Sequence, residues 1–171
     1  MGVTCTFYEE TPVRVKHYLN HHEWPDGRSE LRLRYYDTGK LWTGLHCLFI
    51  KSGTNNTFPG NFIMNGLSLP NYEIDEEYKD DRHAVELTAP FLYSAGETKK
   101  ISKFLDSLDK KKLREGFNPQ YFANNAFPYE YYDDAEDQDD YFHGLYYSFL
   151  KLQRLFQKTV INKNCIIGRM S

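Results

Sequence analysis

The sequence predicts a single α/β domain in which helices flank a mixed β-sheet, and three observations support this fold class. Apolar and polar residues alternate near the N-terminus, in the pattern of a half-buried strand. Between residues 94 and 159, apolar residues recur at intervals of three and four, as on helices with one buried face. The C-terminal "CIIGRM" is a short apolar segment typical of a strand. With 171 residues, 40% of them hydrophobic, the chain has the usual size of one domain.

The first segment predicts a strand followed by a helix. Residues 3–9, "VTCTFYE", place Val3, Cys5 and Phe7 on one side of an extended chain. The pair Thr11-Pro12 is a typical helix start, because threonine caps helices and proline fits the first helical position.

A second strand is expected over residues 31–36, "LRLRYY", with two arginines outward and with Leu31, Leu33 and Tyr35 inward. Residues 53–82 are rich in loop-forming residues, so we expect a variable, loop-rich excursion from the single domain of residues 1–171. The next strand, "HAVELTAPFLY", should end or lie at a sheet edge near Pro90, because proline cannot donate to a strand ladder.

The second half of the chain predicts helices. Ser94 and Glu97 have the spacing of a capping box. Asp109 can cap a second, short helix, and "NPQYFANNAF" offers a third. The longest helix is expected from about Asp139 to Thr159, before the closing strand.

Composition excludes several classes of protein. The net charge of −3 argues against a general nucleic-acid binder, which needs a basic face. The chain lacks a secretory signal and an apolar run long enough to span a membrane, so we expect a cytoplasmic protein. Cys5, Cys47 and Cys165 form no CxxC pair and are interpreted as buried thiols. Phosphate-loop, dinucleotide and nucleophile-elbow motifs are absent, so no cofactor is predicted.

The first candidate site lies in "YYDTGKLWTGLHCLFIKSG", residues 35–53. A helix from Lys40 to about Lys51 places His46 one turn after Trp42, at the boundary of a buried leucine face. One hypothesis is a general base or ligand contact in an aromatic pocket. The other is a histidine that is hydrogen-bonded in the core. Gly44, inside the helix, indicates close approach of another element.

These residues carry a resemblance to a known family. "DTGKLWTGLHCLF" resembles the D-x-x-K-x-W-x-x-L-H-x-L-L signature of the bacterial YfbM-like family, a domain of unknown function. The similarity continues in "LTAPFLYSAGETKKISKFLDSL" and "AFPYEYYDDAEDQDDYFHGLYYSFLKLQRLF". It implies a single α/β domain with a mixed sheet between helices, and no established reaction. The resemblance places four residues of this chain on the family motif, namely Asp37, Lys40, Trp42 and His46. This chain has Thr43 where the family usually has aspartate.

The second candidate site is "YEYYDDAEDQDDY", residues 129–141, which contains seven acids, four tyrosines and no Lys or Arg. A calcium loop is excluded by spacing, because the sixth position lacks glycine and the twelfth lacks glutamate. The segment is a solvated start of the last helix, where negative charge is favourable, or a docking surface for a basic partner, and metal binding is a third alternative. The predicted binding residues are Tyr129, Glu130, Tyr131, Tyr132, Asp133, Asp134, Asp137 and Asp139.

A third cluster, His17, His21 and His22, has partial zinc-ligand spacing. His17 and His21 are four residues apart, but H-E-x-x-H is absent and no acid or cysteine completes the set nearby. No metal site is therefore predicted.

Two functions remain open. The first is a non-catalytic protein-binding module, for example an immunity-type antagonist of a basic toxin or effector, which uses the acidic, tyrosine-rich segment. The second is an enzyme or small-molecule binder with a pocket around Trp42 and His46. We expect a protein partner with a basic surface, and neither nucleic acid nor membrane.

Overall fold

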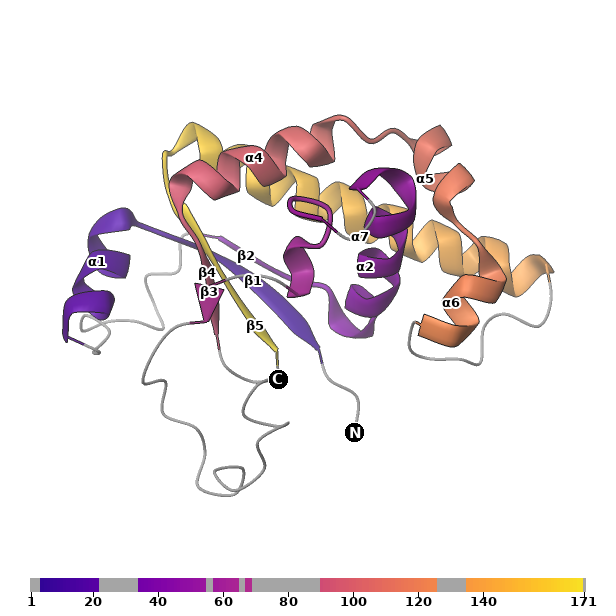
Figure 1. Cartoon of the computed structure of the whole chain (residues 1–171), viewed down its shortest axis with the longest axis horizontal. Helices are drawn as coiled ribbons and strands as arrows, with labels where there is room; N and C mark the ends of the chain where they lie inside the picture. Colours follow the sequence, from indigo (N-terminus) through magenta and orange to yellow (C-terminus); the bar gives the residue numbers. More distant parts are fainter. Residues whose placement is uncertain are drawn as a thin grey trace, which may run out of the picture.

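The computed structural model describes residues 4–21, 34–54, 57–64, 67–68, 90–125 and 135–170. Five strands form one sheet in the order β2-β1-β5-β4-β3 (Figure 1). Every described strand pair is antiparallel, so within these residues the sheet is not mixed in strand direction. The α/β class, with helices flanking a sheet, is confirmed. The strands are β1 (Cys5–Glu10), β2 (Tyr35–Asp37), β3 (Leu67–Ser68), β4 (Phe91–Tyr93) and β5 (Cys165–Met170).

The helices are α1 (Pro12–His21), α2 (Trp42–Phe49), α4 (Ala95–Asp106), α5 (Lys110–Gly116), α6 (Pro119–Asn125) and α7 (Ala135–Ile161). Short turns of helix flank α2: η1 (Gly39–Leu41) precedes it and the π-helical η2 (Ile50–Thr54) follows, while η3 (Phe62–Met64) comes later. Figure 1 shows α4 and α7 running side by side above the strands. No helix in the described residues is long and apolar enough to cross a bilayer.

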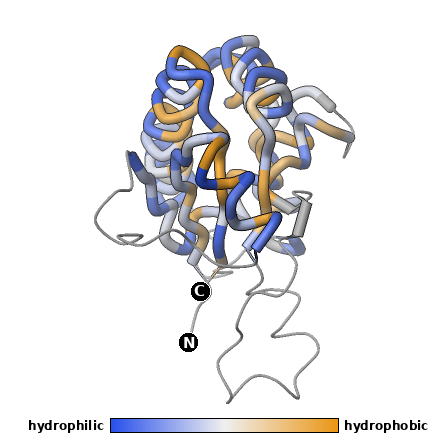
Figure 2. Tube along the Cα trace, turned by 90° about the vertical axis from the view of Figure 1, so that its left-hand side faces the viewer, coloured by the Kyte–Doolittle hydropathy of each residue, from blue (hydrophilic) through white to orange (hydrophobic). Residues whose placement is uncertain are grey.

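The two ends of the chain meet at the centre of the sheet. β1 pairs with β5 along its whole length, from Cys5 opposite Met170 to Glu10 opposite Cys165. The prediction that both terminal strands belong to one sheet is therefore confirmed. Neither strand could bury its apolar side alone, and pairing lets α2, α4 and α7 cover that side together (Figure 2).

The sheet separates two apolar clusters. Phe7 belongs to the main core, which it shares with Phe49 of α2 and Phe156 of α7. Side chains of β1 alternate between the two faces, so Cys5 lies on the same side as Phe7 and belongs to this core, while Thr6 and Tyr8 point to the opposite face. A smaller cluster, to which α1 contributes Val15 and Tyr18, includes Leu92, Cys165 and Ile167 of the sheet.

Local sequence signals account for the helix starts. Thr11 Oγ1 accepts a hydrogen bond from the backbone N–H of Arg14 at 3.3 Å, as expected of a cap. Ser94 and Glu97 form the predicted capping box at the start of α4. Asp109 caps α5 through the N–H of Lys112 at 2.8 Å. These three predictions are confirmed.

The predicted register of the second strand is wrong. Tyr35, expected inward, is 67% exposed, whereas Tyr36 packs against the main core. Arg34, expected outward, instead reaches the buried carboxylate of Glu9. Residues 31–33, which began the predicted strand, lie outside the described residues. A one-residue shift inverts every side chain of a strand, and the ionic partner in β1 fixes the register here.

Part of the expected excursion belongs to the core. Within residues 53–82, the side chains of Phe62 and Ile63 are fully buried. The ring of Phe62 stacks on Phe49 at a centroid distance of 5.5 Å. Within residues 53–82, the structure describes only residues 53–54, 57–64 and 67–68.

Candidate functional site

The motif residues before α2 shape the turn out of β2. Asp37 Oδ1 accepts a hydrogen bond from the N–H of Gly39 at 2.8 Å, and Gly39 has a φ of +57°. Glycine suits this left-handed conformation, because it carries no Cβ. Lys40 follows with an exposed side chain. Asp37 therefore has an evident role in the turn, and Lys40 faces solvent.

His46 lies one turn after Trp42 on α2, as the spacing predicts, and both side chains are half-buried. His46 Nδ1 is shielded from solvent and has no hydrogen-bond partner among the described residues. The hypothesis of a histidine that is hydrogen-bonded in the core is therefore not supported at Nδ1. Burial holds the pKa of His46 below its ordinary value near 6.5, so the imidazole is neutral at pH 7.

The neighbouring Cys47 is not an activated nucleophile. Its Sγ lies 3.5 Å from the carbonyl oxygen of Asn125 in α6, to which the thiol donates. Burial raises the pKa of Cys47 to about 11, against a smaller opposing effect of Lys51. The thiol therefore stays protonated near neutral pH, and a cysteine–histidine pair has no thiolate to offer.

Gly44 explains how closely α2 approaches α7. A Cβ on Gly44 would lie 2.8 Å from Leu145 Cδ2 and still closer to the hydroxyl of Tyr141. Both α7 residues are buried, so neither can move aside freely. The predicted close approach of another element is confirmed, and that element is α7.

The acidic segment is described only in part. Tyr129, Glu130, Tyr131, Tyr132, Asp133 and Asp134 lie outside the described residues. Asp137 and Asp139 are exposed in the first turns of α7. Negative side chains are favourable there, because the N-terminal end of a helix carries partial positive charge.

Arg114 of α5 anchors the start of α7. Its guanidinium forms an ion pair with Asp139 and lies over the ring of Phe142, with Cζ 4.7 Å from the ring centroid. The same Cζ atom lies 5.6 Å from the centroid of the Phe117 ring. Because about half of each charged side chain is exposed, solvent screens the ion pair, and the ring contacts add to it.

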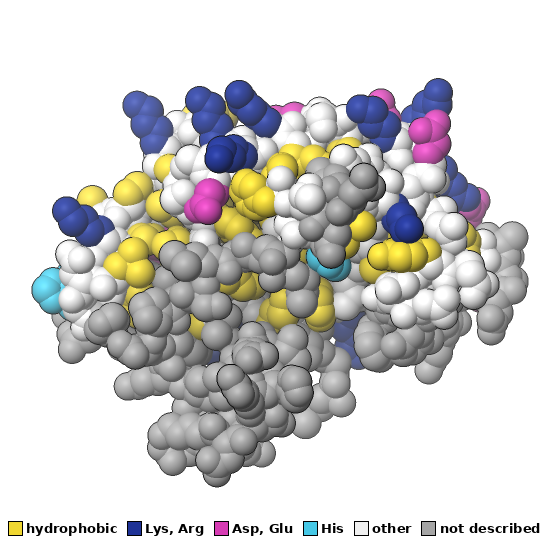
Figure 3. All heavy atoms as spheres, viewed as in Figure 1, with side chains coloured by type: hydrophobic (Ala, Val, Ile, Leu, Met, Phe, Trp, Pro, Cys, Tyr) yellow, Lys and Arg dark blue, Asp and Glu magenta, His cyan; other side chains and the backbone are white. Residues whose placement is uncertain are grey.

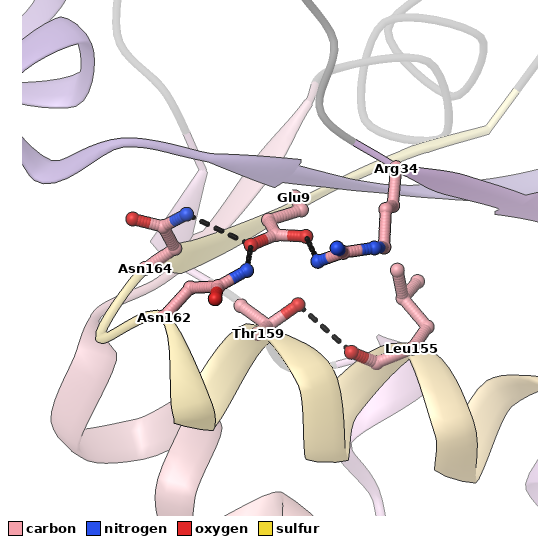
Figure 4. Close-up of polar contacts among 6 residues, drawn as sticks. All are labelled: Glu9, Arg34, Leu155, Thr159, Asn162 and Asn164. Atoms are coloured by element: carbon pink, nitrogen blue, oxygen red, sulfur yellow. Dashed lines mark hydrogen bonds and ion pairs between the residues drawn. The ribbon is translucent and has the colours of Figure 1, made fainter.

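A buried carboxylate cluster was missed in the sequence. Glu9 is fully buried, and its Oε1 accepts hydrogen bonds from the side-chain amides of Asn162 and Asn164, each at 2.8 Å (Figure 4). Its Oε2 accepts from Arg34 Nη1 at 3.0 Å. A signal was present, since alternation from Cys5 and Phe7 puts Glu9 on the same buried side.

This cluster joins β1 to the end of α7. A carboxylate near the C-terminal end of a helix is repelled by the partial negative charge there, and the partly exposed Arg34 cation offsets part of this repulsion. Three side-chain donors reach Glu9, two at Oε1 and one at Oε2, so each oxygen of the buried carboxylate is hydrogen-bonded. Its evident role is structural.

The histidines of α1 do not complete a metal site in the described part of the chain. His17 and His21 are exposed, with ring centroids 4.7 Å apart. No group of three or more His, Cys, Asp or Glu side chains that could hold a metal ion occurs within the described residues. His22 lies outside them.

Comparison with known proteins places the chain in a family. A family described as a domain of unknown function, DUF1877, matches residues 1–168. The crystal structure of YfbM from Escherichia coli, a protein of unknown function, aligns with a TM-score of 0.70 and 18% identity, covering 98% of this chain and 99% of that one. No curated protein matches. The structural likeness shows the same fold, and the chain belongs to the DUF1877, YfbM-like family.

Proposed function

We propose that this protein is a non-catalytic protein-binding module whose acidic surface, comprising residues 129–134 with Asp137 and Asp139, docks a basic protein. The observation that supports this most is the exposure of Asp137 in the first turn of α7, next to Asp139, whose ion pair with Arg114 ties this end of the helix to α5. A rigid helix end presents charge without a large ordering cost on binding.

The chemistry of the segment fits a docking role. Seven acids with no Lys or Arg create a local field that steers a basic partner, and four tyrosines supply ring area of the kind favoured at interfaces. An immunity-type antagonist of a basic toxin or effector would use such a surface. The protonated thiol of Cys47 and the satisfied carboxylate of Glu9 support a binding role over a catalytic one.

Titration with a ten-residue oligolysine peptide, followed by amide chemical shifts of the ¹⁵N-labelled protein, tests the surface. We expect the shifts that change at low salt to cluster in residues 129–140 and to lose their response at high salt. Replacing Asp133, Asp134 and Asp137 by Asn should abolish the response. The control replaces Glu115, an exposed acid of α5, by Gln and should leave the response intact. Shift changes centred elsewhere would refute the proposal.

A second candidate function is a small-molecule site at Trp42 and His46. The observation that favours it is the shielded Nδ1 of His46, which has no partner among the described residues and which a ligand hydroxyl or amide could satisfy. A neutral histidine can act as donor or acceptor there. Screening small amides and alcohols by imidazole ¹⁵N shifts tests this, with His46→Leu as the variant that should lose every hit. The absence of any ligand that shifts the His46 nitrogens would exclude the site.

A further inference from the structure

The outer surface of α1 carries two histidines that lie one helical turn apart. His17 and His21 are four residues apart in the helix, and both side chains are exposed. Their ring centroids are 4.7 Å apart. Figure 3 shows histidine atoms at the surface of the molecule where α1 lies, at the left edge of the view. The two rings therefore already lie beside each other on one face of the helix.

The separation of the rings fits two ligands of one metal ion. Imidazole rings on a tetrahedral Zn²⁺ have centroids about 5 Å apart when each Zn–N bond is about 2.1 Å. Neither ring forms a hydrogen bond or an ion pair within the described residues. In that part of the chain, their nitrogens are therefore available to a metal, and chelation requires little movement of either side chain.

The helix that carries the two rings is fixed on the sheet. Val15 and Tyr18, on another face of α1, are buried in the smaller apolar cluster with residues of β4 and β5. Thr11 caps the helix start, and Arg14 Nε lies 3.5 Å from Glu10 Oε2 of β1. A metal held by both histidines therefore has few further groups to order, which favours binding.

Helix stability accounts for only one of the two histidines. His21 lies in the last turn of α1, where the partial negative charge of the helix end stabilises a protonated ring. His17 lies one turn earlier, and two protonated rings at this spacing repel each other. Of the two cations of the helix, Arg14 is paired with Glu10, and Lys16 lies about 100° around the helix from His17. A shared ligand explains the pair better than the helix dipole does.

We propose that His17 and His21 chelate one divalent transition-metal ion of the group Zn²⁺, Ni²⁺ and Cu²⁺. Imidazole nitrogen suits these ions, whereas Mg²⁺ and Ca²⁺ prefer oxygen ligands. No third His, Cys, Asp or Glu joins the pair in the described part of the chain, so water takes the remaining coordination positions and the site is open. The sequence spacing alone predicts no metal site, and the proximity of the two rings is what supports this one. The inference does not depend on the acidic surface, to which α1 contributes no residue.

Calorimetric titration of the untagged full chain with ZnCl₂, after removal of metal with EDTA, tests the site. We expect one tightly bound Zn²⁺ per chain and no binding of Mg²⁺. His17→Gln and His21→Gln should each weaken Zn²⁺ binding by about 100-fold, because a second ligand on the same helix acts at a high effective concentration. His143→Gln, at an exposed histidine of α7, is the matched control and should bind like wild type. Both substituted positions of α1 are exposed, so the variants should fold, and circular dichroism checks this.

Imidazole ¹⁵N spectra locate the bound metal. Zn²⁺ should shift the ring nitrogens of His17 and His21 together, at the same Zn²⁺ concentration, and leave those of His143 unchanged. A shift at only one of the two α1 rings would show an adventitious contact with a single histidine and would overturn chelation. Zn²⁺ binding that is equally tight in wild type and in His17→Gln/His21→Gln would place the metal elsewhere and would also overturn the inference.

Discussion

The buried carboxylate of Glu9 in β1 accepts a hydrogen bond at 3.0 Å from Nη1 of Arg34, which directly precedes β2, and helix α1 lies between the two residues in the sequence. The pair sets the register of β2 against β1 and offsets the negative end of α7. The same carboxylate accepts hydrogen bonds from Asn162 and Asn164, so it links the strand to the segment that follows α7.

Glu9→Gln should therefore lower the free energy of unfolding by about 3 kcal/mol, because it removes the charge that the buried donors need. Arg34→Met should cost less, about 1 kcal/mol, since the Arg34 side chain is 43% exposed and solvent already screens it. Urea unfolding followed by circular dichroism measures both. Glu115→Gln, at an exposed acid, is the control and should lie within about 0.5 kcal/mol of wild type. Equal stability of Glu9→Gln and that control would contradict a role for the cluster.

Two glycine substitutions should change stability in opposite directions. Gly44→Ala adds a Cβ that meets Leu145 and Tyr141, so we expect a loss of about 1 to 3 kcal/mol despite the better helix propensity of alanine. Gly144→Ala in α7 meets nothing within 4 Å and should gain up to about 1 kcal/mol. Thermal and urea unfolding measure whether each substitution lowers or raises the free energy of unfolding. A stabilised Gly44→Ala would show that α7 can move away from α2 at little cost.

The low pKa of His46 predicts a pH dependence of stability. Because burial lowers the pKa in the folded chain, the unfolded chain takes up a proton at His46 at higher pH. The contribution of the neutral His46 to the free energy of unfolding is fully present above about pH 6.5, the pKa of the unfolded chain. This contribution is lost as the pH falls below that value. Wild type should therefore lose more stability between pH 7 and pH 5 than His46→Gln does. The exposed His17→Gln is the control and should follow wild type. Parallel curves for wild type and His46→Gln would be inconsistent with a shifted histidine.

Alkylation tests whether Cys47 is inert. With a pKa of about 11, its thiolate fraction at pH 8 is far below that of an unperturbed cysteine, so iodoacetamide should label it about 200-fold more slowly in the folded protein than in urea. Mass spectrometry of the labelled peptides gives the rate at each cysteine. Native labelling as fast as in urea would instead identify an activated thiol beside His46.

The acidic surface makes a kinetic prediction about its protein partner. Changing Asp133, Asp134, Asp137 and Asp139 to Asn should slow association and flatten its salt dependence, because exposed charges act on encounter. Tyr131→Ala or Tyr132→Ala should instead speed dissociation, if the ring fills a pocket. Stopped-flow association at low and high salt measures the first effect. A four-Asn variant that associates as fast as wild type at low salt would leave the segment as a solvated helix start.

Some of the fold was readable from short-range signals. The capping box at Ser94 and Glu97, the Thr11 cap and the buried stripe of α7 depend on residues within a few positions of each other, so local chemistry is enough to predict them. The motif spacing likewise placed His46 one turn after Trp42.

Tertiary structure alone decided the rest. The register of β2 depends on the contact of Arg34 with Glu9, and the exposure of Tyr35 follows from it. The unpartnered nitrogen of His46 and the contact of Gly44 with α7 also arise between segments far apart in the chain. Local propensity is the same in either register of a short strand, and the energy that separates the two registers comes from a partner that a local pattern does not identify.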